Sequence, residues 1–234
     1  MPRSLRVNRP ELPAGVVTIP VRTKLVQPGE NLTQVVTDAV RGIAGPGDVV
    51  AVSETAVAIA QGQAVPAEYV RPSRLACFLA RRAGALATVN QPESLQIVMD
   101  QAGVGKVVYA CVMHLVGKAI GRRGMFYEIM GEAITAIDGY TGTMPPFERA
   151  IVFAPQNPAA FAQSVADAAS VGCAVVDAND LEKAKILGAS RGIHRKNVEY
   201  ALLANPHGNG DEQTPVVVLK WRGLGANPLF EAAN

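Results

Sequence analysis

The sequence predicts an α+β fold with mixed sheets and packed helices. Short runs of β-branched and apolar residues alternate with segments of helical spacing, but without the even rhythm of a doubly wound parallel sheet. Hydrophobic residues make up 49% of the 234 residues and aromatic residues only 5%, which favours a tightly packed core of alanine, valine and leucine. We expect one main domain over residues 15–222, with tails over residues 1–14 and 223–234.

The first hundred residues alternate between strands and helices. Val16 to Arg22 is rich in β-branched residues and predicts a strand, and so does Val49 to Ser53 after the turn at Gly45 to Asp48. Asn31 is the expected N-cap of a helix that continues to Ile43. Two further helices are expected at Pro72 to Ala83 and at Ser94 to Gln101.

The second half of the chain continues the alternation. We expect strands at Lys106 to Val112, Ile151 to Ala154, Cys173 to Val176 and Val216 to Leu219. Helices are expected at Pro158 to Val171 and Ile193 to Leu203, and a helical or mixed segment at Phe126 to Ile137. The tail from Gly223 is rich in glycine, asparagine and alanine, and we expect it to be weakly structured.

Composition excludes several classes of protein. The net charge is only +2 and aromatic residues are few, which argues against a nucleic-acid-binding surface. Met1 to Pro13 lacks the apolar core of a signal peptide, and no run of about 18 apolar residues could cross a membrane. The cysteines Cys77, Cys111 and Cys173 are widely spaced and are interpreted as reduced thiols. We therefore expect a cytoplasmic protein.

Three acidic blocks lie at the edges of predicted elements. Asp177, Asn179 and Asp180 follow the apolar run Ala174 to Val176, whose carboxyl end is where α/β proteins gather ligands. Asp211 and Glu212 precede the last strand, and Asp138 and Gly139 lie mid-chain. Hard carboxylate oxygens suit Mg²⁺ or Mn²⁺, so the three blocks predict one metal–nucleotide site. Any one aspartate, Asp180 above all, has the alternative role of a cap or turn residue.

Phosphate-binding motifs give a mixed result. Gly103 to Lys106 contains Gly-Lys, but Val107 replaces the hydroxyl residue that a P-loop requires, so we reject a P-loop. Lys118, Arg122 and Arg123 form a basic patch between glycines. That patch either binds phosphate or carboxylate groups or is a solvated turn.

Glutamate and histidine residues supply further candidates. Glu128 and Glu132 would share one face of a helix, either as ligands or as a solvated acidic face. His114, His194 and His207 do not have the spacing of a metal site. His207 lies in a loop close to Asp211 and is the best catalytic or ligand candidate of the three, whereas His114 is typical of a core histidine.

Six segments carry a resemblance to a known family: Ile19 to Leu32, Gly47 to Gly62, Val70 to Ala76, Ala136 to Gly139, Val175 to Asp180 and Gly210 to Val217. Their residues and their order resemble the coenzyme F-420:L-glutamate ligases, also called F-420-0 γ-glutamyl ligases, over about residues 15–220. The first hundred residues are the most similar. At Asp177 the family usually has Asp-Thr-x-Gly-Arg, whereas this chain has Ala178 and then Asp180-Leu181, so it resembles a divergent member.

The resemblance implies a homodimer with the γ-glutamyl-ligase fold and a GTP- or ATP-dependent ligase. Such enzymes phosphorylate a carboxylate, and an amine such as that of L-glutamate then attacks the acyl phosphate. The resemblance implies that Asp138 and Asp177 ligate the metal and that Asp211 and Glu212 either complete the site or position water. We add Asp180 to the expected metal ligands. The expected cofactor-binding residues are Lys24, Ser53, Glu54, Gly139 and Asn179. The expected catalytic residues are Asp177, Arg122, Arg123 and His207, of which the arginines and His207 come from our own interpretation of the sequence.

Two other classes of function remain open at this stage. A non-catalytic protein of the same fold would bind a nucleotide or metabolite without turnover, and the loss of the usual residues after Asp177 favours it. A metal-dependent hydrolase would use the same carboxylates without an amino-acid acceptor. In every case the expected partners are small molecules, with no nucleic acid and no membrane.

Overall fold

A five-stranded mixed sheet forms the centre of the computed structural model, which describes residues 15–83, 90–122, 124–131, 134, 137–139, 146–179, 183–208 and 212–231. The strand order is β1-β8-β2-β6-β7. Only β2 and β6 run parallel, and the other neighbours are antiparallel. The strands are β1 (Val16–Val21), β2 (Val49–Ser53), β6 (Gly172–Asn179), β7 (Lys183–Ala189) and β8 (Val216–Trp221).

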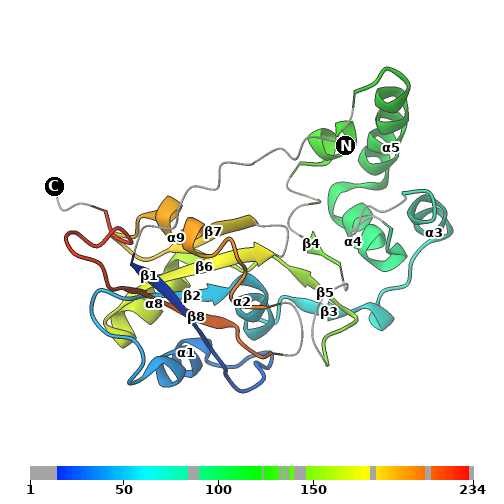
Figure 1. Ribbon diagram of the computed structural model, residues 1–234. Coiled ribbons are helices and arrows are strands. Elements are labelled where there is room, and N and C mark those ends of the chain that lie inside the picture. Colours follow the sequence, from blue (N-terminus) through cyan, green and yellow to red (C-terminus); the bar gives the residue numbers. More distant parts are fainter. Residues whose placement is uncertain are drawn as a thin grey trace.

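Helices cover both faces of this sheet (Figure 1). Alternate strand residues point to opposite faces, so Val50 and Val52 belong to one core cluster and Val49 and Ala51 to another. The first cluster packs against α1 (Leu32–Val40), α2 (Glu54–Ala60) and α8 (Pro158–Ala169). The second packs against α9 (Arg195–Ala201). Burial on both faces explains why these strands are apolar throughout.

A smaller antiparallel sheet of order β3-β5-β4 carries a second group of helices (Figure 1). Ile137 of β4 and Ile151 of β5 belong to the core cluster of these helices. The strands are β3 (Ala64–Pro66), β4 (Ile137–Asp138) and β5 (Ala150–Phe153), and the 3-10 turn η1 (Ala67–Tyr69) follows β3. The helices are α3 (Arg74–Ala80), α4 (Pro92–Ala102), α5 (Val104–Ala119) and α6 (Met125–Met130).

Most predicted elements of the large sheet are confirmed. Asn31 caps α1 as expected, because its Oδ1 accepts a hydrogen bond from the Gln34 N–H at 3.2 Å. The helix predicted from Pro72 begins two residues later, because Ser73 is the N-cap and its Oγ accepts from the Ala76 N–H at 3.1 Å. The predicted mixed segment at Phe126 to Ile137 contains α6 except for Met125, and it ends at the first residue of β4. The strands β3 and β7 were not predicted.

The strand predicted at Lys106 to Val112 is wrong, because this segment lies inside the helix α5. Valine favours strands by a small margin only, and a helix that packs on others overrides that preference. The buried positions Val107, Ala110 and Gly117 are three and seven residues apart, which is helical spacing. A Cβ at Gly117 would lie 2.6 Å from Met125 Sδ, so the glycine lets α6 pack closely against α5.

The segment from Gly223 is more ordered than its composition suggested. Leu229 is fully buried in the core cluster beneath α9. Its carbonyl accepts a hydrogen bond from the His194 N–H at 2.9 Å, and Asn227 Nδ2 donates to the Gly47 carbonyl at 2.7 Å. Residues 223–231 therefore belong to the folded body.

Candidate functional site

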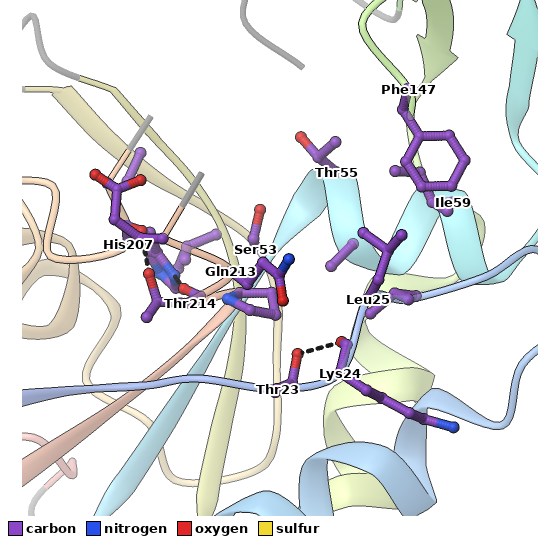
Figure 2. Close-up of a pocket in the computed structure, with 17 residues that line it drawn as sticks. Thr23, Lys24, Leu25, Ser53, Thr55, Ile59, Phe147, His207, Gln213 and Thr214 are labelled. Atoms are coloured by element: carbon purple, nitrogen blue, oxygen red, sulfur yellow. Dashed lines mark hydrogen bonds between the residues drawn. The ribbon is translucent and has the colours of Figure 1, made fainter. Parts of the chain in front are cut away.

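A cavity of about 170 Å³ opens at the carboxyl ends of β2 and β6, on the side where β1 ends and β8 begins (Figure 2). Four segments that lie far apart in the sequence build most of its wall. The lining residues are Thr23, Lys24, Leu25, Val26, Ser53, Thr55, Ala56, Ile59, Phe147, Val176, Ala178, His207, Gly208, Glu212, Gln213, Thr214 and Pro215.

Backbone hydrogen bonds tie these segments together. The Thr23 N–H donates to the Gln213 carbonyl at 3.0 Å, and the Ser53 N–H donates to the Pro215 carbonyl at 2.8 Å. The segment before β8 is thus clamped between the ends of β1 and β2, which follows from the place of β8 between those two strands. The wall is therefore held by the sheet itself.

Lys24 and Glu30 form an ion pair at one end of the wall. The hydrogen bond from Lys24 holds the pKa of the Glu30 carboxyl below its usual value, with help from the Gln27 N–H, which donates to Glu30 Oε2 at 3.0 Å. The Lys24 side chain is largely exposed and, in Figure 2, extends away from His207. Its charge is accessible from solvent at this end of the cavity.

His207 lies at the other end and is 9% exposed. Its Nδ1 lies 3.1 Å from the Thr214 carbonyl oxygen. A carbonyl can only accept, so Nδ1 carries the hydrogen and Nε2 carries a lone pair. Nε2 is buried and has no hydrogen-bond partner among the described residues. Burial lowers the pKa of His207 to about 4, although the hydrogen bond with Thr214 opposes this shift. The imidazole is therefore neutral at physiological pH.

Two predicted carboxylates, Glu212 and Asp177, belong to segments that build the cavity wall. Glu212 lines the cavity, and its carboxylate lies over Gly208: a Cβ at that glycine would be 2.8 Å from Glu212 Oε2. Asp177 is exposed and lies on β6 between two lining residues, opposite Lys185 of β7. Partial burial raises the pKa of the Asp177 carboxyl, and the charge of Lys185 opposes that shift.

Three of the remaining predicted residues are not among those that line the cavity. Arg122 follows α5 and donates to Glu128 Oε2 at 2.8 Å, with both side chains exposed. Gly139 packs against Gln91, since a Cβ there would lie 2.1 Å from Gln91 Oε1. Glu54 is the first residue of α2, between the lining residues Ser53 and Thr55.

Several predicted residues, or their side chains, are not among those that the structure describes. Arg123, Glu132, Asp180 and Asp211 lie outside the described residues, as do the side chains of Asp138 and Asn179. Among the described side chains, no three His, Cys, Asp or Glu come together as a metal centre would require. The carboxylates of Asp177 and Glu212 have the donor chemistry that fits Mg²⁺ or Mn²⁺.

Sequence reasoning missed the neutral part of the wall. Thr23, Thr55, Gln213 and Thr214 supply hydroxyl and amide groups, and Phe147 supplies an apolar side. The available signal was their position directly after or before a predicted strand, where side chains at the sheet edge are exposed to ligands. Phe147 gave no such signal.

The sequence model of the F420-0:Gamma-glutamyl ligase family matches residues 20–207, most of the chain. The chain belongs to this family. The match begins in β1 and ends at His207, so it includes Lys24, Ser53 and Asp177, whereas Glu212 and β8 lie beyond it. No curated protein matches the chain. In the part of the chain that the structure describes, no helix has the length and apolarity needed to cross a membrane.

Proposed function

We propose that this member of the family is a nucleotide- and metal-dependent amide ligase that joins an amino acid, such as L-glutamate, to a carboxylate acceptor. The observation that carries the proposal is the convergence of Lys24, Ser53 and Glu212 on one cavity, from segments that the family resemblance associates with nucleotide and metal. The family membership supports a ligase, and the cavity supplies a place for its substrates.

The proposed reaction has two steps. An oxygen of the acceptor carboxylate attacks the terminal phosphorus of GTP or ATP, and the nucleoside diphosphate leaves. The amine nitrogen then attacks the acyl carbon of this acyl phosphate, an amide bond forms, and inorganic phosphate leaves with the proton balance completed by solvent. Phosphate groups need positive charge and hydrogen-bond donors, which Lys24, Ser53 and Thr55 offer at their side of the cavity.

Asp177 and Glu212 would hold Mg²⁺ or Mn²⁺, together with the predicted ligands Asp138, Asp180 and Asp211. The ion would neutralise phosphate charge. Asn179, Gly139 and Glu54 remain proposed nucleotide contacts. Arg122 and Arg123 remain proposed phosphate or carboxylate contacts, although Arg122 does not line this cavity. The cytosol is the proposed compartment.

A homodimer is also proposed. The face of α5 that points away from its core cluster exposes a row of apolar side chains, and patches of this kind mark protein contacts. The row consists of Val104, Val108, Tyr109, Val112, Leu115, Val116 and Ile120. A second copy of the chain would cover it with an equivalent row, as twofold symmetry requires.

The deciding experiment measures phosphate release from GTP and from ATP with Mg²⁺ or Mn²⁺. L-glutamate and a panel of carboxylate acceptors are each added and omitted. Release that requires both acceptor and amine, and that is lost in Asp177→Ala but kept in the surface control Asp100→Ala, would support the ligase. Mass spectrometry of the product would identify the acceptor.

Two outcomes would contradict the ligase. Metal-dependent nucleotide binding without turnover under any pairing would indicate a binding protein. Release that is lost in Asp177→Ala but needs no acceptor would indicate a hydrolase.

A further inference from the structure

The cavity at the ends of β2 and β6 is small for the ligands that the proposed function requires. Its volume is about 170 Å³, whereas pockets for drug-sized ligands typically have roughly 300–1,000 Å³. A shallow groove of about 520 Å³ lies between the segment after β1 and the helix α1. Thr23 and Lys24 line both the cavity and this β1–α1 groove, so the two hollows meet at these residues. A ligand that exceeds the cavity can therefore extend into the groove.

Two carboxylates line the described part of the β1–α1 groove, and both are already compensated. Glu30 forms the ion pair with Lys24. Asp38 accepts hydrogen bonds from the Arg41 guanidinium at 2.6 Å and from Gln34 Nε2 at 2.9 Å. Because each carboxylate has a basic partner, neither leaves an uncompensated negative charge that would repel an anion.

Arg22 is the remaining charged residue of the groove wall. It follows β1 directly and is exposed, and its guanidinium has no hydrogen-bond or ion-pair partner in the part of the chain that the structure describes. A guanidinium presents a fork of N–H donors that matches two oxygens of one phosphate or carboxylate group. The groove thus offers one uncompensated positive charge with the donor geometry that oxyanions require.

The position of Arg22 distinguishes it from Arg122, the arginine that the sequence favoured. Arg122 donates to Glu128 and lines neither the cavity nor the β1–α1 groove. Arg22 lies two residues before Lys24, which belongs to both walls. An oxyanion bound by Arg22 would therefore belong to a ligand that also reaches the cavity.

We propose that the β1–α1 groove is an anion subsite of the cavity, in which the Arg22 guanidinium binds a phosphate or carboxylate group of a ligand. This inference rests on the proposed function and adds a binding residue to it. The oxyanion comes either from the nucleotide, as a phosphate, or from the amino acid, as a carboxylate. Both have the same chemistry toward a guanidinium, and the experiment below separates them.

The direct test follows the guanidinium itself. Protein with ¹⁵N-labelled arginine is examined by NMR of the side-chain Nε–H groups, and the Arg22 signal is assigned with the Arg22→Lys variant. Pyrophosphate, L-glutamate and non-hydrolysable analogues of GTP and ATP are added separately, with and without Mg²⁺, against sodium chloride of equal ionic strength. We expect a saturable shift of the Arg22 signal with at least one of these anions.

Arg222 provides the internal control. It is also an exposed arginine that directly follows a strand, but it lies beyond Trp221, which pairs with Val16 at the start of β1. Arg222 is therefore at the opposite end of the large sheet from Arg22, and its signal should change no more than in sodium chloride. An Arg22 signal that responds to none of the probes, or that moves only in parallel with Arg222, would overturn the inference.

The pattern of shifts identifies the source of the oxyanion. A response to pyrophosphate and to a nucleotide analogue, but not to L-glutamate, would assign the groove to phosphate. A response to L-glutamate alone would assign it to the carboxylate of the amino acid. Either pattern in a protein that shows no nucleotide turnover would uphold the anion subsite and reject the ligase.

Binding constants of variants provide a second test. Arg22→Gln removes the charge and the fork, so Kd for either the nucleotide analogue or L-glutamate, measured by calorimetry, should rise by about fivefold or more. Arg22→Lys should give a smaller rise, because it keeps the charge and loses the fork. Thermal unfolding of both variants should be unchanged, and Arg222→Gln should alter neither Kd. Phosphate release with unchanged binding constants in Arg22→Gln would uphold the ligase and reject the subsite.

Discussion

Thr214 binds His207 through two hydrogen bonds that run in opposite directions. The Thr214 hydroxyl donates to the His207 carbonyl at 2.5 Å, and His207 Nδ1 donates to the Thr214 carbonyl at 3.1 Å. This pair closes the loop between α9 and β8 and fixes the imidazole against the cavity. The orientation and the tautomer of His207 are thus set by the same residue.

The first prediction concerns the pH dependence of stability. The pKa of His207 falls from 6.5 to about 4 on folding, so the unfolded chain binds the proton more tightly. The contribution of His207 to stability is therefore intact above pH 6.5 and is lost as pH falls toward 4, by about 3 kcal/mol. Urea unfolding at pH 7 and pH 4 measures it. In His207→Phe the pH-dependent loss should be smaller by this amount, and an unchanged loss would contradict the assignment.

The second prediction concerns Asp177. Its pKa in the folded state is raised, so the folded state binds the proton of Asp177 more tightly than the unfolded chain does. The resulting contribution to stability is fully present below the unfolded pKa of about 3.8 and is lost as pH rises through the folded pKa. Asp177→Asn should therefore be more stable than the unmodified protein at pH 7 and equal to it near pH 3.5. Thermal unfolding at both pH values, with Asp100→Asn as a surface control, measures the difference. A destabilised Asp177→Asn at pH 7 would indicate that the pairing with Lys185 outweighs burial.

The third prediction concerns Gly188 of β7. A Cβ there would lie 2.2 Å from the Ala159 nitrogen and 2.3 Å from the Pro158 carbonyl carbon, both of which are backbone atoms. Gly188→Ala must push α8 away from the sheet and should reduce the free energy of unfolding by about 1–3 kcal/mol. Gly105→Ala is the matched control, because its Cβ meets nothing within 4 Å and the helix should gain up to about 1 kcal/mol. Denaturant unfolding compares the two, and equal effects would show that the close packing at Gly188 is relieved easily.

The fourth prediction concerns the apolar row on α5. Leu115 is 66% exposed, so Leu115→Glu should not disturb the core of the chain. If a second copy covers this row, the variant should be monomeric by light scattering at concentrations where the unmodified protein is dimeric. Tyr69→Glu, at a 78% exposed residue of η1, is the control and should remain dimeric. A dimer that survives Leu115→Glu would place the contact elsewhere.

Local sequence patterns predicted the large sheet well because its strands are buried on both faces and read as continuous apolar runs. Val49 to Ser53 and Val216 to Leu219 are of this kind. The strand β7 was missed because Lys183 and Lys185 interrupt its apolar character at the edge of the sheet. The helix α5 was mistaken for a strand because its exposed valines lie among its buried residues in the sequence.

The candidate site was also predicted only in part. Lys24, Ser53, His207 and Glu212 were predicted, and the structure brings all four to one cavity. Arg122 appeared equally suitable in the sequence, but its partner is Glu128, six residues away. Charge and glycine spacing alone do not distinguish a ligand-binding arginine from one in a local ion pair. The neutral residues Thr55 and Gln213 could be recognised only once the strand order was known.

The position of β8 has a consequence for how the protein reaches its folded state. This strand is the last of the described strands in the sequence, yet it lies between β1 and β2 in the sheet. During synthesis the edges of β1 and β2 that pair with β8 therefore stay unpaired until β8 itself has left the ribosome. The segment that carries Glu212 and Thr214 leads directly into β8, so the cavity wall is completed only by this late insertion. Nascent or truncated chains without β8 should therefore expose the unpaired edges of β1 and β2, which are prone to aggregation, and should lack the completed cavity wall.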